Sequence, residues 1–539
     1  MKQIALAFSL LFLIFVHSSA EYNPSVRIDP ALDRFFHRMQ TRYGFYPHDP
    51  GIQPFGTKVL SEALDSLYNS RSLSPRERYE LLRLQERLSP FHGFSYQSEE
   101  KDLHINFNLN LLGDVEGSLN DDAIGGRGII NPRLSGNVGI LSFYSEVDVW
   151  TEYRSDTLFG PSTYQPYDGI PYNLYGRNTE EANLRSSDLP RGGINISLNR
   201  IDLALAIDYL KLGPAQFYPN TLSGLAPPIT YAKAELDMGP VRYYHLAGLL
   251  QSQRDKRKYI YAHRLSGRWR ALHVGLNEII INGSTTDQQG PNDPHNSLRD
   301  AYYKEERQER QLEIAYLIPF VPFVIVEHYL GDRDNAAISL DFSLTWPENF
   351  LFYGEFHIDD ILSPWQIFSD DWGNKWAITA GMAWYGTLFG KDFSSGIEYS
   401  RVEPWVYTHF YGGSHRFDHF DQPLGSPFGP NSRAVLAYAD LGISNRNSVG
   451  IRLSSIERNP HTRGGSIDHV FQDDVPGNEF PDSNTKEFLK SEGKIHHLRP
   501  GIYWNFDPFG LFRVDALYEI DLKEDRGRSR LSLYGGFYF

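Results

Sequence analysis

The residues with the clearest chemical potential lie in one stretch rich in Gly and Pro, GGSHRFDHFDQPLGSPFG. It contains His415, Asp418, His419 and Asp421, and imidazoles and carboxylates at this spacing are able to hold a divalent ion. Solvated loops also use such residues simply to cap turns, and we prefer that interpretation to a metal site. Sugar binding is a third interpretation. Aromatic rings stack on sugar faces, while carboxylates and imidazoles bond the hydroxyl groups.

The sugar hypothesis also outranks the metal site, because two long loops supply its aromatic and polar groups. We expect no metal and no cofactor. The candidate polysaccharide-binding residues are Tyr164, Tyr167, Tyr172, Tyr411, Phe417, Asp418, His419, Phe420 and Asp421.

A second set consists of acidic residues that we expect at inward or rim positions of a barrel. We prefer to interpret them as the ordinary polar wall of a barrel, neutralised by nearby Arg and Lys. Contact with a hydrophilic polymer or its bound cations is the functional alternative. The set comprises Glu355, Asp359, Asp360, Asp370, Asp371, Glu398 and Glu403.

No enzyme signature accompanies these residues. The sequence contains no G-x-S-x-G, no H-E-x-x-H and no P-loop. Hydrolases of the outer membrane assemble their sites from several strands, so the missing motifs are partial evidence only. We predict a protein that is not an enzyme.

The elements that must position these residues read as strands. In DLHINFNLNLL, apolar residues alternate with His and Asn, and the same period of two recurs in long segments down to the final SRLSLYGGFYF. We count sixteen to twenty strands, including QLEIAYLI, and predict an all-β transmembrane barrel of 18 antiparallel strands. The final strand, which ends in the aromatic Phe539, would close the cylinder.

The connections between strands divide into two kinds. Asn199-Arg200 and Met238-Gly239-Pro240 are tight turns, whereas residues 156–191, 283–299, 412–432 and 459–494 form long polar loops. Short turns at one end and long loops at the other are typical of outer-membrane barrels.

The first 95 residues differ from the rest. Residues 1–20 resemble a cleaved signal peptide, with Lys2, an apolar middle, and Ser18 and Ala20 before the cut. Residues 21–95 are predicted to form a periplasmic helical module, and residues 96–539 the barrel. The module has three amphipathic runs, the third opening with a capping box at Ser74 and Glu77. We expect it to pack against the periplasmic mouth.

Composition agrees with export to the Gram-negative outer membrane. The 539 residues contain no Cys, 14% are aromatic, and the formal net charge is −15, which argues against nucleic acid as a partner. Outside the signal there is no apolar run long enough to indicate a helical membrane protein.

Several ordered stretches resemble the Wzi-like capsule assembly proteins of the outer membrane. They are LHVGLNEIIING (272–283), residues 322–360, WGNKW (372–376), GIEYSRVEPWVYTH (396–409) and the PLGSPFGPNS loop (412–431). The resemblance implies an 18-stranded barrel with periplasmic helices and a lectin-like, non-enzymatic role in retaining or organising surface polysaccharide.

We therefore expect an outer-membrane barrel that binds extracellular polysaccharide, with outer-membrane lipid and the polysaccharide export machinery as further partners. Many weak sugar contacts would add up along a polymer. Two alternatives stay open: a passive or solute-selective channel, and an outer-membrane hydrolase.

Overall fold

The computed structural model describes residues 23–26, 30–45, 49–70, 73–88, 93–98, 103–118, 124–155, 173–175, 184–198, 200–251, 257–283, 312–331, 334–361, 363–409, 414–469, 485–490, 492–507, 512–521 and 526–538. The expected signal peptide and Phe539 lie outside these residues. Division of the chain at residues 20 and 95 remains a prediction.

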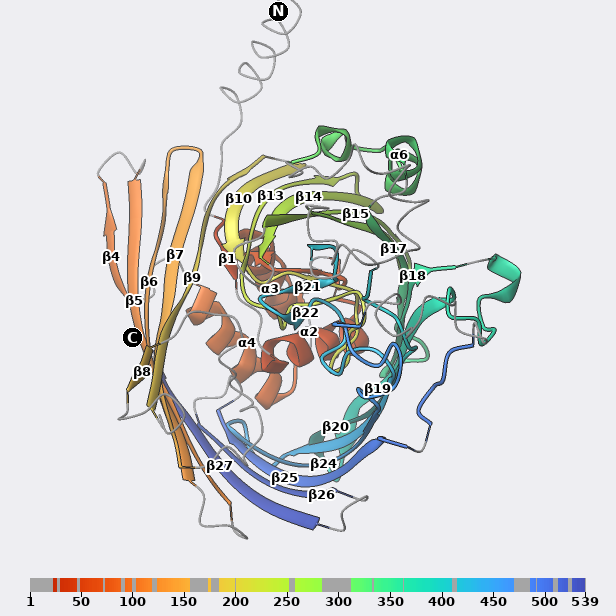
Figure 1. The fold of residues 1–539 in the computed structure, drawn as a ribbon. Coiled ribbons are helices and arrows are strands. Elements are labelled where there is room, and N and C mark those ends of the chain that lie inside the picture. The colour runs from red at the N-terminus through yellow and green to blue at the C-terminus, as the bar shows by residue number, and fades with distance from the viewer. Residues whose placement is uncertain are drawn as a thin grey trace, which may run out of the picture.

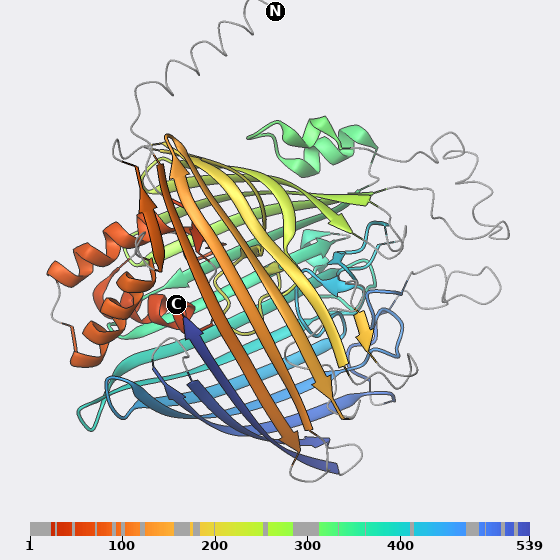
Figure 2. The same cartoon turned by 90° about the vertical axis from the view of Figure 1, so that its left-hand side faces the viewer.

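The chain folds into a closed antiparallel β-barrel of 18 strands (Figures 1 and 2). The wall strands are β5 (Leu103–Ser118), β6 (Ile124–Val138), β7 (Leu141–Arg154), β9 (Leu184–Ser197), β10 (Ile201–Asp208), β13 (Ile229–Asp237), β14 (Val241–Gln251), β15 (Arg257–Trp269), β16 (Leu272–Gly283), β17 (Asn335–Leu344), β18 (Phe350–Asp360), β19 (Lys375–Leu388), β20 (Lys391–Val402), β23 (Ser432–Gly442), β24 (Asn447–Arg458), β25 (Ile495–Phe506), β26 (Phe512–Asp521) and β27 (Arg526–Tyr538).

The last strand closes the wall, as the sequence predicted. β27 pairs antiparallel with β5, from Arg530 opposite Ser118 to Tyr538 opposite Asn110. Two short strands lie beside the wall: β4 (Phe94–Gln97) pairs with β5, and β8 (Asn173–Tyr175) pairs with β9.

The alternation in the sequence corresponds to the two faces of this wall. In β27, Leu531, Leu533 and Phe537 point outward and are 44%, 42% and 66% exposed. In β5, His104 and Asn106 point inward and are buried. An apolar exterior with polar residues toward the lumen is the arrangement that a lipid bilayer requires.

Tight turns gather at one end of the barrel, which we call the turn end. Between β13 and β14, Met238 N–H donates to the Val241 carbonyl (2.9 Å), and Gly239 adopts a φ of +87°. The opposite end, which we call the loop end, carries longer connections, including residues 209–228 and 403–431.

The helical module has the three predicted helices, α2 (Pro30–Tyr43), α3 (Thr57–Ser70) and α4 (Pro75–Leu88). Their predicted apolar faces meet in one core that includes Leu32, Phe36, Leu60 and Leu84. The capping box is also present. Ser74 Oγ accepts the Glu77 N–H (3.2 Å), and the Glu77 carboxylate accepts the Ser74 N–H (2.9 Å).

The module packs into the turn end, as expected (Figure 2). Gln40 donates to Ser343 Oγ on β17 (2.9 Å), and Arg76 donates to the Asn447 carbonyl at the β23–β24 turn (3.0 Å). Tyr79 Oη donates to Asp507 at the end of β25 (3.1 Å). These contacts reach β17, β24 and β25, so the helices lie across the mouth rather than apart from it.

Three local predictions were wrong. The stretch QLEIAYLI is not a strand: its residues 314–317 form the 3-10 helix η3 (Ile314–Leu317), followed by α6 (Phe323–Leu330). Residues 184–191 belong to β9 instead of a loop. β20 ends at Val402, because Trp405 and Tyr407 adopt positive φ values in the turn that follows.

Among the described helices, none has the length and apolar content to cross a membrane.

Candidate functional site

A loop that the sequence did not single out enters the lumen. Residues 209–228 connect β10 to β13 and contain the short strands β11 (Lys211–Leu212) and β12 (Leu222–Ser223). β11 pairs with β12 on one side and with β2 (Ile52–Gln53) of the N-terminal module on the other. A three-stranded sheet inside the barrel therefore joins the module to this loop, which we call the plug loop.

Glu355 on β18 holds one part of the plug loop. Its buried carboxylate accepts the backbone N–H groups of Ala215 (2.9 Å) and Asn220 (2.8 Å). Gly213 adopts a φ of +111°, and a Cβ there would collide with the Glu355 carboxylate. Only glycine fits this approach.

Glu398 on β20 holds the adjacent part. It accepts the N–H groups of Gln216 (2.9 Å) and Phe217 (3.0 Å), together with that of Tyr218. The hydroxyl of Tyr353 also donates to Glu398 (2.7 Å). Backbone amides and the Tyr353 hydroxyl, and not the expected Arg and Lys, thus bond the two inward carboxylates. Such charge-assisted bonds fix the loop firmly.

An apolar core surrounds this polar anchor inside the lumen. Ile52, Leu212 and Leu222 of the internal sheet pack with wall residues such as Ile260 and Ile279, and all are buried. Arg264 on β15 adds a charged tie, since it donates to Asp49 (3.0 and 3.1 Å) and to Asp341 (2.9 Å). On this side of the barrel, protein fills the space that a channel would leave to water.

The second inward loop, 403–431, contains β21 (Asp418–His419) and β22 (Gln422–Pro423). Phe417 stacks on Tyr407 with ring centroids 5.4 Å apart. Asp418 pairs with Lys258 of β15 and with Arg416 (3.0 Å). Phe417 and Asp418 are 1% and 0% exposed, so the structure gives them a role in filling the lumen.

His419 is also buried in this loop. Its Nδ1 accepts the Gln251 N–H (2.9 Å), and burial lowers its pKa to about 4. Asp421 bonds Arg416 (2.7 Å) and, like Phe420, is partly exposed. Of the nine candidate sugar-binding residues, Tyr164, Tyr167, Tyr172 and Tyr411 lie outside the described residues.

The remaining acidic candidates separate by position. Asp359 is buried and accepts the Tyr407 N–H (2.8 Å), and Glu403 is buried beside Lys486 (2.9 Å). At the loop end, Asp360 and Asp370 are exposed and Asp371 is half-buried. Among the residues that the structure describes, no three His, Asp or Glu side chains gather closely enough to bind a metal ion.

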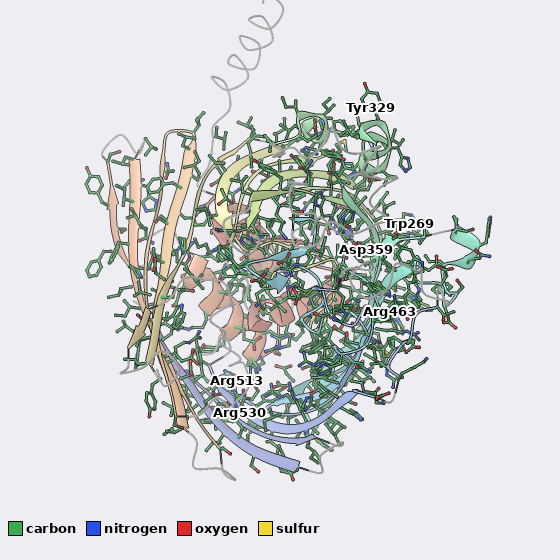
Figure 3. All side chains as sticks on the ribbon, in the orientation of Figure 1. Trp269, Tyr329, Asp359, Arg463, Arg513 and Arg530 are labelled. Carbon is green, nitrogen blue, oxygen red and sulfur yellow. The ribbon has the colours of Figure 1, made fainter. Side chains whose placement is uncertain are left out.

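The wall formed by β24, β26 and β27 differs from the packed side. Three inward arginines keep part of their side chains exposed: Arg452 (30%), Arg513 (28%) and Arg530 (19%). Arg513 and Arg530 are seen inside the ring of strands in Figure 3. Acidic residues balance them, because Asp515 bonds Arg513 (2.9 Å) and Glu116 pairs with Arg530.

The chain thus has an outer-membrane type of β-barrel fold, with a helical module across the turn end and two loops folded into the lumen. This fold is similar to that of Wzi, an outer-membrane protein involved in group 1 capsule assembly in Escherichia coli and described as a carbohydrate-binding β-barrel. The TM-score is 0.57 at 12% sequence identity, covering 96% of this chain and 99% of that one. The match confirms the fold that the family resemblance implied.

Weaker similarities connect the chain with OprD of Pseudomonas aeruginosa (TM-score 0.41, 10% identity, 83% of this chain and 97% of that one) and a BenF-like porin of Pseudomonas fluorescens (TM-score 0.40, 8% identity, 81% and 98%). No protein-family model and no curated protein matches the sequence.

Proposed function

We propose that the protein is a closed outer-membrane barrel whose outer loops bind and retain, or organise, capsular or exopolysaccharide without catalysis. The turn end and the helical module face the periplasm, and the loop end faces outward. Tyr164, Tyr167, Tyr172 and Tyr411, with Phe420 and Asp421, are the proposed sugar contacts. Export machinery would meet the module from the periplasmic side.

The observation that carries this proposal is the plug loop, which is packed inside the lumen. A solute channel needs a continuous aqueous path, but Glu355 and Glu398 hold the plug loop against the wall, and an apolar core packs around it. The proposal therefore places binding at the outer end. The similarity to a carbohydrate-binding barrel supports the same conclusion.

Buried Phe417, Asp418 and His419 contribute to this function by holding the 403–431 loop in place. Deleting residues 412–432 would therefore disturb the lumen as well as the surface, so point substitutions are the better test.

The test measures cell-bound and released polysaccharide in cells that lack the protein and in complemented cells. We expect loss of cell-bound polymer without the protein, restoration by the natural chain, and failure by a Tyr164→Ala/Tyr167→Ala/Tyr172→Ala variant. Tyr329→Ala, which changes an exposed tyrosine on α6, is the matched control and should restore retention. Equal retention with and without the protein would refute the proposal.

One observation favours a second candidate, a lipid hydrolase. On the outward face near the loop end, Ser455 Oγ lies 2.9 Å from His496 Nε2, and His496 Nδ1 lies 3.9 Å from Glu457. A serine, a histidine and an acid are the groups of a hydrolytic triad. However, 3.9 Å is too long for a hydrogen bond, and Glu457 already bonds Arg433 and Lys494 (both 2.8 Å).

The Ser455→Ala variant tests the hydrolase candidate. Release of fatty acid from phospholipid in detergent micelles, abolished by this substitution, would establish the hydrolase. If the natural chain released no fatty acid, the hydrolase would be refuted, and the contact between Ser455 and His496 would be structural only.

A further inference from the structure

The segment 312–331, LEIAYLIPFVPFVIVEHYLG, comes from the loop-end connection between β16 and β17 but lies on the outside of the barrel. It holds η3 and α6, and Figure 2 shows α6 beyond the strands, alongside the wall. We call this segment the strap. Its inner residues Tyr316, Phe323 and Val326 are buried against Tyr259 and Tyr261 of β15.

Beneath the strap, the outward face of the wall is polar. Tyr243 and His245 on β14, His263 on β15 and Glu278 on β16 point outward, where β-barrels usually carry apolar residues. His263 Nε2 lies 2.6 Å from Glu278, and Phe323 stacks on His263 with centroids 4.1 Å apart. The strap therefore covers a polar patch that would be costly to expose to lipid.

The same polar groups satisfy the strap's own backbone. The N–H of Glu313 donates to Tyr261 Oη (2.6 Å), that of Phe320 to Tyr243 Oη (2.9 Å) and that of Phe323 to Glu278 (2.7 Å). Pro319 and Pro322 carry no N–H. Irregular backbone is tolerated in a bilayer only where its polar groups are satisfied by protein.

The strap lies beside lipid-facing residues of the wall. The tip residue Phe320 contacts Tyr243 on β14. Tyr243 lies opposite Leu265 of β15. Leu276 of β16 and Leu340 of β17 continue the same row of paired residues. These three leucines face outward and are 48%, 41% and 48% exposed. The strap tip is thus flanked by the apolar band of the wall.

The outer face of the strap is mostly apolar as well, with His328 as an exposed polar residue near the end of α6. It exposes Ile314 (71%), Ile318 (53%), Phe320 (63%), Ile325 (61%) and Tyr329 (86%). Tyr329 lies on the outer side of α6 (Figure 3). This face continues the lipid-facing surface of β15 to β17 over the polar patch.

We infer that the strap is an intramembrane element: its outer face contacts the hydrocarbon of the outer membrane, and its inner face seals the polar patch from lipid. The inference rests on the proposed outer-membrane location. It assigns lipid, rather than a second copy or a partner protein, as the occupant, because the strap face is continuous with the apolar band.

The natural absence of Cys allows a direct test. Single variants Ile318→Cys and Ile325→Cys of the full chain carry a nitroxide label after reconstitution into phospholipid vesicles, and collision with oxygen and with a water-soluble nickel chelate is measured. Leu340→Cys, on the outward face of β17, is the lipid control. Lys490→Cys, on an exposed loop, is the water control.

We expect labels at 318 and 325 to behave like the label at 340, with high oxygen collision and about tenfold less chelate collision than at 490. Chelate collision as high as at 490 would place the strap in water and overturn the inference. Low collision with both reagents would show a protein covering and would also overturn it. If the label at 340 itself collided with the chelate as often as the label at 490, the proposed membrane location would be refuted instead.

Discussion

At the scale of single residues, the buried carboxylates of the lumen hold the plug loop in its observed conformation. Glu398 accepts three backbone N–H groups, and glutamine offers only one acceptor and no charge. Because a hydrogen bond to a charged group contributes about 1.5–3 kcal/mol, Glu398→Gln should speed amide exchange at Gln216 and Phe217 roughly 10- to 100-fold. Glu487→Gln, in an exposed pair with Lys490, is the control and should change nothing there. Unchanged exchange in Glu398→Gln would contradict the anchoring role.

The buried imidazole of His419 makes the second inward loop sensitive to acid. Burial lowers its pKa to about 4, below the usual value of about 6.5, so an opened loop binds a proton that the closed loop does not. Closure is therefore fully stable above pH 6.5 and weakens as the pH falls toward 4, by as much as about 3 kcal/mol. Exchange of the Gln251 amide, corrected for the intrinsic rate, should accelerate over this window in the natural chain and not in His419→Gln. The same pH slope in both chains would refute this prediction.

At the scale of elements, the plug loop depends on a close approach that a matched pair of glycines can test. Gly213 and Gly239 both adopt positive φ, but a Cβ at Gly213 would meet Glu355, whereas a Cβ at Gly239 meets nothing within 4 Å. A positive φ strains an alanine at both sites, and the collision with Glu355 is added only at Gly213. We expect Gly213→Ala to increase proteolysis within residues 209–228 and Gly239→Ala to leave it unchanged. Equal proteolysis of both variants would show that the collision with Glu355 does not destabilise the plug loop.

Sequence periodicity predicted which strands and helices form better than it predicted what the connecting loops contact. The capping box at Ser74 and the alternation in β5 and β27 are local signals, and the structure confirms both. The plug loop has no such signal, because its partners Glu355 and Glu398 lie more than 130 residues away and it binds them through backbone amides. Asp418 was placed on the surface for the same reason, since its partner Lys258 lies 160 residues away and becomes a neighbour only in the folded barrel. QLEIAYLI, at the start of the strap, was mistaken for a strand, because periodicity alone does not distinguish a short apolar strand from a short apolar helix.

At the scale of the whole molecule, the plug loop, the internal sheet and the helical module together predict a barrel that does not conduct. In planar bilayers, the natural chain should show no steady current, whereas Glu355→Gln/Glu398→Gln should show intermittent openings as the plug loop detaches. The partly exposed arginines of β24, β26 and β27 would then face the water path. A large steady current through the natural chain would favour the channel alternative over polysaccharide binding.

The central claim is that the outer end of a closed barrel binds polysaccharide, and direct binding tests it best. Surface polysaccharide purified from the cells that carry the protein is passed over the full-length, detergent-solubilised chain, and equilibrium binding is measured. We predict saturable binding that falls about tenfold or more in Tyr164→Ala/Tyr167→Ala/Tyr172→Ala, since several weak contacts act together along one polymer. Absence of binding by the natural, correctly folded chain would contradict the account.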